Sequence, residues 1–252
     1  RCPRICIRGF YGRRGRHSYP SLRAQQGAVA ACSSARRLTQ TYTAVHTSGM
    51  STAEKRLLTA AEYLAIESAA EIRHEFLEGE MFAMSGGSLW HNLIKDNFAR
   101  AVANRLTGGT CRVVTSDQRL KVDATGLYTY PDVLVFCGPP QMEDGVHHTL
   151  TNPVLVAEVL SDSTEKYDRG IKFGHYRRLE TLQEYLLIAQ DRFSVEVFAR
   201  QGNGSGAAGS DGWLLSAASE REAEVRLASL GIAVPLVEIY EGVEFPPAAP
   251  AR

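Results

Sequence analysis

Hydrophobic and polar positions along the chain follow two periods, and these periods predict its elements. Residues 89–106 carry apolar side chains at helical spacing and end at a Gly pair, which predicts an amphipathic helix. Residues 57–66 predict a shorter helix, with Thr59 as its N-cap and Glu62 completing a capping box. A third helix is predicted at about residues 167–179.

Short apolar runs bounded by Gly, Pro and polar residues predict the strands. Residues 75–77 and 80–84 read as a hairpin that turns at Gly79. The other predicted strands are residues 111–114, 118–122, 130–136, 153–160, 184–189 and 194–199. Residues 202–212 are predicted to form a Gly/Ser-rich turn. This order predicts a mixed α/β domain of the α+β kind, with one central sheet flanked by helices.

Two of the apolar strands each carry one carboxylate. Asp132 lies near the start of the run at 130–136, and Glu158 lies inside the run at 153–160. An ionised acid in a buried strand costs several kcal/mol unless a partner compensates it. A hard divalent cation such as Mg²⁺ would satisfy both acids if the strands are neighbours. Alternatively, Asp132 accepts backbone N–H bonds and Glu158 pairs with a nearby Arg or Lys.

Composition narrows the class of protein. The length of 252 residues and the hydrophobic fraction of 44% suit one domain with a proper core. No apolar run approaches the roughly 20 residues that a membrane span needs, so no membrane partner is expected. The five Cys form no CxxC pair and resemble neither a disulfide framework nor a zinc site. We therefore expect a reducing, cytoplasmic setting.

The charge is distributed unevenly along the chain. Residues 1–53 contain nine Arg and no Lys, Asp or Glu, so 19 of the 28 basic residues remain against all 28 acids, a formal charge of −9. We expect residues 1–49 to be a disordered extension, either a transit-type presequence or, as we favour, sequence upstream of a start at Met50. Residues 50–245 are then the folded domain, and residues 246–252 a frayed tail.

Several short motifs occur in a fixed order along this domain. They are Glu78-Gly79-Glu80, His91-Asn92, Tyr130-Pro131-Asp132-Val133, Glu158-Val159-Leu160-Ser161-Asp162-Ser163-Thr164, Tyr167-Asp168-Arg169-Gly170 with Lys172 and Tyr176, and Glu184-Tyr185. From about residue 57 to residue 245 the chain thereby resembles the Uma2 family of endonucleases. That resemblance implies the PD-(D/E)XK, or restriction-endonuclease-like, fold.

The usual signature of that fold is Asp, then Glu-x-Lys on the next strand. The sequence departs from it, because the residue two after Glu158 is Leu160. The resemblance implies that the basic group has migrated to the following helix, at Lys172. Lys121 and Lys166 are the rival positions.

The resemblance implies a metal-dependent endonuclease that hydrolyses phosphodiester bonds. Asp132 and Glu158 would hold Mg²⁺, or Mn²⁺ in its place, and Lys172 would assist. Glu80 is a candidate third carboxylate, or else a solvated strand residue. His91 could orient a water or phosphate at a helix N-terminus, or else be structural.

The expected partner is nucleic acid, DNA in the first instance, and a homodimer is expected from related folds. The alternative function is a catalytically weak nucleic-acid-binding or assembly module that keeps a degenerate nuclease fold. Two features favour that alternative. The acidic domain gives no indication of a broad basic face, and Leu160 leaves the Glu-x-Lys signature incomplete.

Overall fold

The computed structural model describes residues 56–143, 148–202 and 212–245. These residues belong to one compact unit. The predicted extension at 1–49, the tail at 246–252 and most of the predicted turn at 202–212 lie outside the described residues.

The centre of the fold is a six-stranded mixed sheet in the order β11-β10-β9-β8-β6-β3. Strands β8 and β9 pair in parallel, and the other neighbours are antiparallel. The six strands are β3 (Cys111–Thr115), β6 (Val133–Cys137), β8 (Leu155–Val159), β9 (Glu184–Ile188), β10 (Val195–Arg200) and β11 (Trp213–Ala218). Every residue of β8 and β9 is buried, as their apolar sequences predict.

The central mixed sheet with flanking helices is confirmed, but not every predicted strand joins it. Five of the described strands form a second sheet in the order β2-β1-β5-β4-β7. They are β1 (His74–Leu77), β2 (Glu80–Ala83), β4 (Arg119–Val122), β5 (Leu127–Thr129) and β7 (Thr149–Leu150). The β1–β2 hairpin turns at Glu78 and Gly79, which both have positive φ, as a two-residue turn of this hand requires. A separate pair joins β12 (Glu224–Leu227) to β13 (Ile232–Pro235).

The helices begin where local capping predicts. Helix α1 (Ala60–Ala69) has the Thr59–Glu62 capping box, and α2 (Leu89–Arg105) begins after Ser88, whose hydroxyl accepts from the His91 amide. The predicted third helix is irregular: α3 (Glu165–Tyr167) runs through a π-helical turn (Asp168–Lys172) into α4 (Phe173–Tyr176). The remaining helical segments are a 3₁₀ turn (Ala228–Leu230) and α5 (Leu236–Ile239).

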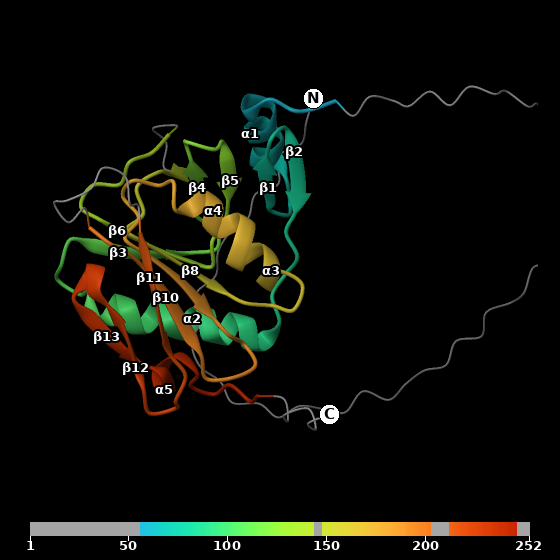
Figure 1. Cartoon of the computed structure of the whole chain (residues 1–252). Helices are drawn as coiled ribbons and strands as arrows, with labels where there is room; N and C mark the ends of the chain where they lie inside the picture. The colour runs from blue at the N-terminus through green and yellow to red at the C-terminus, as the bar shows by residue number, and fades with distance from the viewer. Residues whose placement is uncertain (1–55, 144–147, 203–211, 246–252) are drawn as a thin grey trace, which may run out of the picture. The chain divides into compact units, whose positions relative to one another are not determined.

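Helices cover both faces of the six-stranded sheet. Figure 1 shows α2 on one side and the α3–α4 segment on the other. Alternation along β8 sends Leu155, Ala157 and Val159 into the core beside α2. Val156 and Leu160 lie in the opposite core with Tyr176 of α4. Glu158 therefore faces the α3–α4 side.

Cys111 and Cys137 form a disulfide, which corrects the expectation that no disulfide is present. The antiparallel register of β3 and β6 places the two residues opposite each other. They lie 26 residues apart in sequence, so only strand pairing reveals their proximity.

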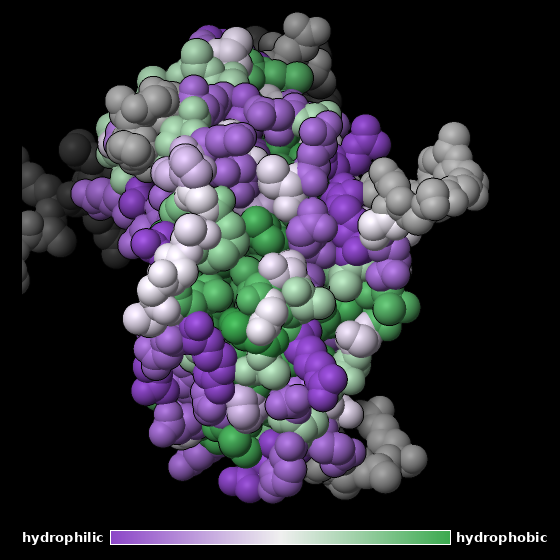
Figure 2. Space-filling model, turned by 90° about the vertical axis from the view of Figure 1, so that its left-hand side faces the viewer, coloured by the Kyte–Doolittle hydropathy of each residue, from purple (hydrophilic) through white to green (hydrophobic). Residues whose placement is uncertain are grey.

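A hydrophobic patch lies on the side of the molecule where β3, β6 and β13 lie in Figure 1. Hydrophobic residues gather there in a central hollow among hydrophilic ones (Figure 2). In the part of the chain that the structure describes, no helix is long and apolar enough to cross a bilayer.

Candidate active site

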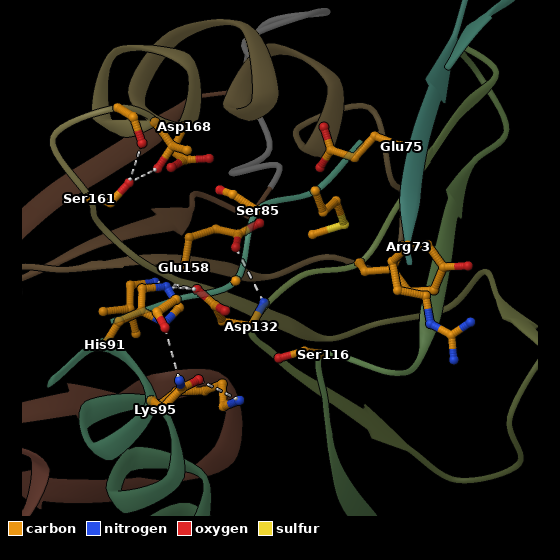
Figure 3. Close-up of a pocket in the computed structure, with 18 of the residues that line it drawn as sticks. Arg73, Glu75, Ser85, His91, Lys95, Ser116, Asp132, Glu158, Ser161 and Asp168 are labelled. Carbon is orange, nitrogen blue, oxygen red and sulfur yellow. Dashed lines mark hydrogen bonds and ion pairs between the residues drawn. The ribbon is translucent and has the colours of Figure 1, made fainter. Parts of the chain in front are cut away.

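A cavity of about 560 Å³ opens where the two sheets and the two helical layers meet. Its lining comes from the β1–β2 hairpin, the N-terminus of α2, the ends of β6 and β8, and the π-helical turn. Figure 3 shows Asp132 and Glu158 at its centre, with Arg73 and Glu75 on one side and His91 and Lys95 on the other. The cavity thus collects charged residues from distant parts of the sequence.

Asp132 and Glu158 lie on neighbouring strands and hold each other in place. The antiparallel β6–β8 register pairs Val133 with Ala157. Asp132, just before β6, therefore lies opposite Glu158 at the same end of the sheet. The Asp132 amide donates to Glu158 Oε2 at 3.2 Å, and the Val159 amide donates to Asp132 Oδ2 at 2.8 Å. The two acid-bearing strands are neighbours, as a shared metal would require, and both carboxylates reach the same cavity.

Lys172 brings a buried cation to this pair. Its Nζ lies 2.9 Å from Glu158 Oε1, 3.1 Å from Glu75 Oε1 and 3.6 Å from Asp168 Oδ1. The last contact joins two residues that are four apart in sequence. Lys172 belongs to a π-helical turn, a local widening that often occurs at functional sites.

The rival lysines lie elsewhere. Lys121 pairs with Asp123 at 2.9 Å and with Glu143 at 2.5 Å on the second sheet, and it does not line the cavity. Lys166 also lies outside the lining residues. Leu160, which occupies the position of the usual lysine, is buried in the apolar core.

Burial and charge shift the proton affinities of this cluster. Burial raises the pKa of Glu158, although the charge of Lys172 opposes the shift. Burial also raises the pKa of Asp168, again against Lys172. For Lys172, burial acts to lower the pKa, but Glu158 and the other acids outweigh it and hold the pKa well above its usual value. Lys172 is therefore an ammonium at neutral pH.

Glu75 is a site residue that the sequence did not reveal. Its carboxylate contacts Lys172 and accepts hydrogen bonds from Thr129 and from the Tyr167 hydroxyl, the latter at 3.2 Å. Burial would raise the pKa of Glu75, but Lys172 and these donors lower it. The sequence feature that could have indicated Glu75 is its position as an acid at the start of an otherwise apolar hairpin strand.

Glu80, the predicted third carboxylate, occupies the turn end of β2 opposite Leu77. It is not among the residues that line the cavity. Glu75 projects from the same face of the hairpin as Glu80, because the pairs Glu75–Phe82 and Leu77–Glu80 lie two residues apart, but Glu75 lies farther from the turn and lines the cavity.

His91 and Tyr176 contact the two central acids from opposite helices. His91 Nε2 lies 3.2 Å from Asp132 Oδ2, and the Tyr176 hydroxyl donates to Glu158 Oε1 at 2.8 Å. Burial acts to lower the pKa of His91, but the hydrogen bond and charge of Asp132 raise it above its usual value. Gly87 lies so close that a Cβ there would stand 2.5 Å from His91 Nδ1. His91 thus contacts Asp132 through Nε2, and the absence of a side chain at Gly87 leaves room for its ring.

The donor set fits a magnesium ion that is completed by substrate. In the described ranges, no group of three or more His, Cys, Asp or Glu side chains is arranged to hold a metal by itself. Mg²⁺ commonly binds one or two carboxylates and fills its other positions with water and phosphate oxygens. Asp132 and Glu158 supply this number, and Glu158 shares the one buried lysine, Lys172, with Glu75 and Asp168.

The mixed sheet, its flanking helices and the acid pair at the strand ends define a nuclease-like α+β fold. A crystal structure of a protein from Anabaena variabilis, described as "a putative nuclease belonging to DUF820", shares this fold. The TM-score is 0.58 with 18% sequence identity, over 73% of this chain and 97% of that chain.

The sequence then places the protein within a family. Residues 60–232 match the Uma2 family, whose description is "Putative restriction endonuclease", and the chain belongs to this family. Two relatives from Synechocystis sp., sll1609 and slr1290, both carry the description "Uncharacterized protein". They are 36% and 35% identical over 183 and 190 residues, which cover 73% and 75% of this chain and 99% and 94% of theirs.

Proposed function

We propose that the protein is a Mg²⁺-dependent endonuclease that hydrolyses phosphodiester bonds in DNA. The observation that carries this proposal is the contact of 2.9 Å between Lys172 Nζ and Glu158 Oε1. It brings a cation to the acid pair although Leu160, just after β8, stands where the usual lysine would be. The family description supports a nuclease, and nucleases act on nucleic acid.

Asp132 and Glu158 are the residues that would hold the metal. A bound Mg²⁺ would lower the pKa of a water and offset negative charge on the phosphate. His91 donates to Asp132 from the α2 N-terminus and so orients its carboxylate. The buried end of β8 and the Tyr176 hydroxyl fix Glu158 in the same way.

Lys172 has a narrower role than a general base. Because its pKa is raised well above the usual value, it is protonated throughout the neutral range. A protonated lysine accepts no proton from water, but it stabilises negative charge that develops on a phosphate. We therefore assign Lys172 to electrostatic stabilisation of the reacting phosphate.

The test is cleavage of supercoiled and of single-stranded DNA by the full chain with Mg²⁺ or Mn²⁺, and with EDTA as the metal-free arm. Asp132→Asn and Lys172→Met should each lower the nicking rate by about 100-fold or more. The control is Lys121→Met, which removes a lysine outside the cavity and should retain the wild-type rate.

The same experiment distinguishes the nuclease from a catalytically weak nucleic-acid-binding or assembly module. If folded wild-type protein cleaves no DNA and binds no metal by calorimetry, the nuclease proposal fails and a binding or assembly module remains. The formal charge of −9 beyond residue 53 favours that alternative over the nuclease, because this total does not indicate a broad basic face. Homodimer formation stays a prediction that sedimentation of the same protein would measure.

A further inference from the structure

One face of the β1–β2 hairpin borders the cavity, and it carries an exposed aromatic ring beside a buried carboxylate. Glu75 pairs directly with Phe82 across the hairpin. Side chains of directly opposed residues project from the same face of a hairpin. Since Glu75 reaches Lys172 inside the cavity, Phe82 projects toward the same space. Both residues line the cavity.

The opposite face of the hairpin packs into a small hydrophobic core. Phe76 and Met81 belong there, packed with Tyr63 of α1 and Tyr128 of β5. Phe82 takes no part in that cluster, and half of it, 50%, is exposed. Its ring therefore has no structural task among the described side chains that form the cores.

Phe82 has companions along the same rim. Ile72 is 55% exposed and lines the cavity with Met84. The Arg73 guanidinium, whose side chain is 45% exposed, lies 5.6 Å from the centre of the Tyr130 ring. Across the acid pair, Lys95 lines the far wall (Figure 3). The rim thus offers an open aromatic ring and apolar surface, with a cation on each side of the central acids.

This combination suits an unstacked base better than an intact duplex. In a duplex the flat faces of the bases are stacked on one another, so a protein meets only phosphates and base edges. Proteins that bind single strands use aromatic rings for base stacking and a few cations for the backbone. The formal charge of −9 beyond residue 53 also disfavours the many phosphate contacts that duplex binding uses.

We infer that Phe82 is a stacking platform for a nucleobase next to the scissile phosphate, and that the substrate is single-stranded DNA. This inference rests on the proposed function for the position of the phosphate. The hairpin supplies the stacking ring, and Arg73 and Lys95 flank the strand. A duplex would enter only where a base has already left the stack.

The test measures binding in EDTA, so that it does not depend on cleavage. The full chain is titrated into a single-stranded oligonucleotide that carries 2-aminopurine, whose fluorescence is quenched by stacking, and into the blunt duplex of the same sequence. Wild type should bind the single strand about tenfold more tightly. Phe82→Leu should weaken that binding about fivefold or more and abolish the quenching. Phe82→Tyr, which keeps the ring, should remain close to wild type.

Leu214→Ala is the matched control, because Leu214 is 58% exposed on β11 and lies outside the cavity. Unchanged affinity in folded Phe82→Leu, or tighter binding of the blunt duplex by wild type, would overturn the inference. Nicking that survives such a result would leave the nuclease proposal intact. Conversely, Phe82-dependent binding without metal-dependent nicking would retain the stacking surface and remove the nuclease.

Discussion

The ammonium of Lys172 lies 2.9 Å from the carboxylate of Glu158, although one residue belongs to a π-helical turn and the other to a central strand. Both side chains are almost fully buried, with 5% and 4% exposed. A buried ion pair tolerates the loss of one partner poorly, because the other charge is then left without compensation. The stability and the chemistry of the site are therefore coupled.

That coupling predicts a pattern of unfolding free energies. Lys172→Met leaves three neighbouring acids without their common cation and should lower stability by about 3–5 kcal/mol. Adding Glu158→Gln should recover part of this loss, because one uncompensated charge disappears. Urea unfolding of the two variants measures both effects. Lys121→Met, at a partly exposed pair, should cost no more than about 1 kcal/mol; an equal loss at both lysines would contradict the coupling.

The two acids of the hairpin should behave differently. Glu75→Gln removes a charge that contacts Lys172, so it should slow metal-dependent nicking about tenfold or more. Glu80→Gln changes a residue outside the cavity lining and should retain most of the wild-type rate. Rates at saturating DNA and Mg²⁺ compare the two. The reverse order would return Glu80 to the site in place of Glu75.

A small change on the α2 side should act through His91. Gly87→Ala places a methyl group 2.5 Å from His91 Nδ1, so the ring must shift away from its contact with Asp132. The nicking rate should fall to about that of His91→Ala. Gly86→Ala is the matched control, because a Cβ there meets no atom within 4 Å. If both Gly variants retain the wild-type rate, His91 does not position Asp132.

The Arg105–Glu238 pair predicts a pH dependence of stability away from the site. Two hydrogen bonds of 2.8 Å from Arg105 lower the pKa of Glu238 below its usual 4.5. A carboxyl whose pKa is lower in the folded state stabilises the protein above its unfolded pKa, and the effect disappears as pH falls through the lowered value. Arg105→Gln should therefore cost about 0.5–1 kcal/mol at pH 7, after allowance for solvent screening, and almost nothing near pH 3.

Thermal unfolding of wild type and Arg105→Gln across this range measures the difference. A gap in stability that stays constant from pH 7 to pH 3 would show that Arg105 acts through packing and its bond to the Ala101 carbonyl alone.

The sequence by itself determined α1, α2, the β1–β2 hairpin and most strands of the central sheet, because helix caps and apolar periodicity act over a few residues. It did not predict β5, β7 or the irregular third helix. The capping box at Thr59, the turn at Gly79 and the length of α2 are local properties, and the structure confirms them. It also identified the two acid-bearing strands, since Asp132 and Glu158 are conspicuous within apolar runs.

Only the tertiary structure decided which distant side chains join those acids. Packing of the hairpin against the π-helical turn placed Glu75 beside Lys172 in the cavity, while Glu80 at the turn end lies outside the lining. Strand register paired Cys111 with Cys137. A single π-helical turn aimed Lys172 at Glu158, while Lys121 joined the second sheet. These outcomes depend on one-residue shifts of register and on packing between elements far apart in sequence, and no local pattern of residues encodes them.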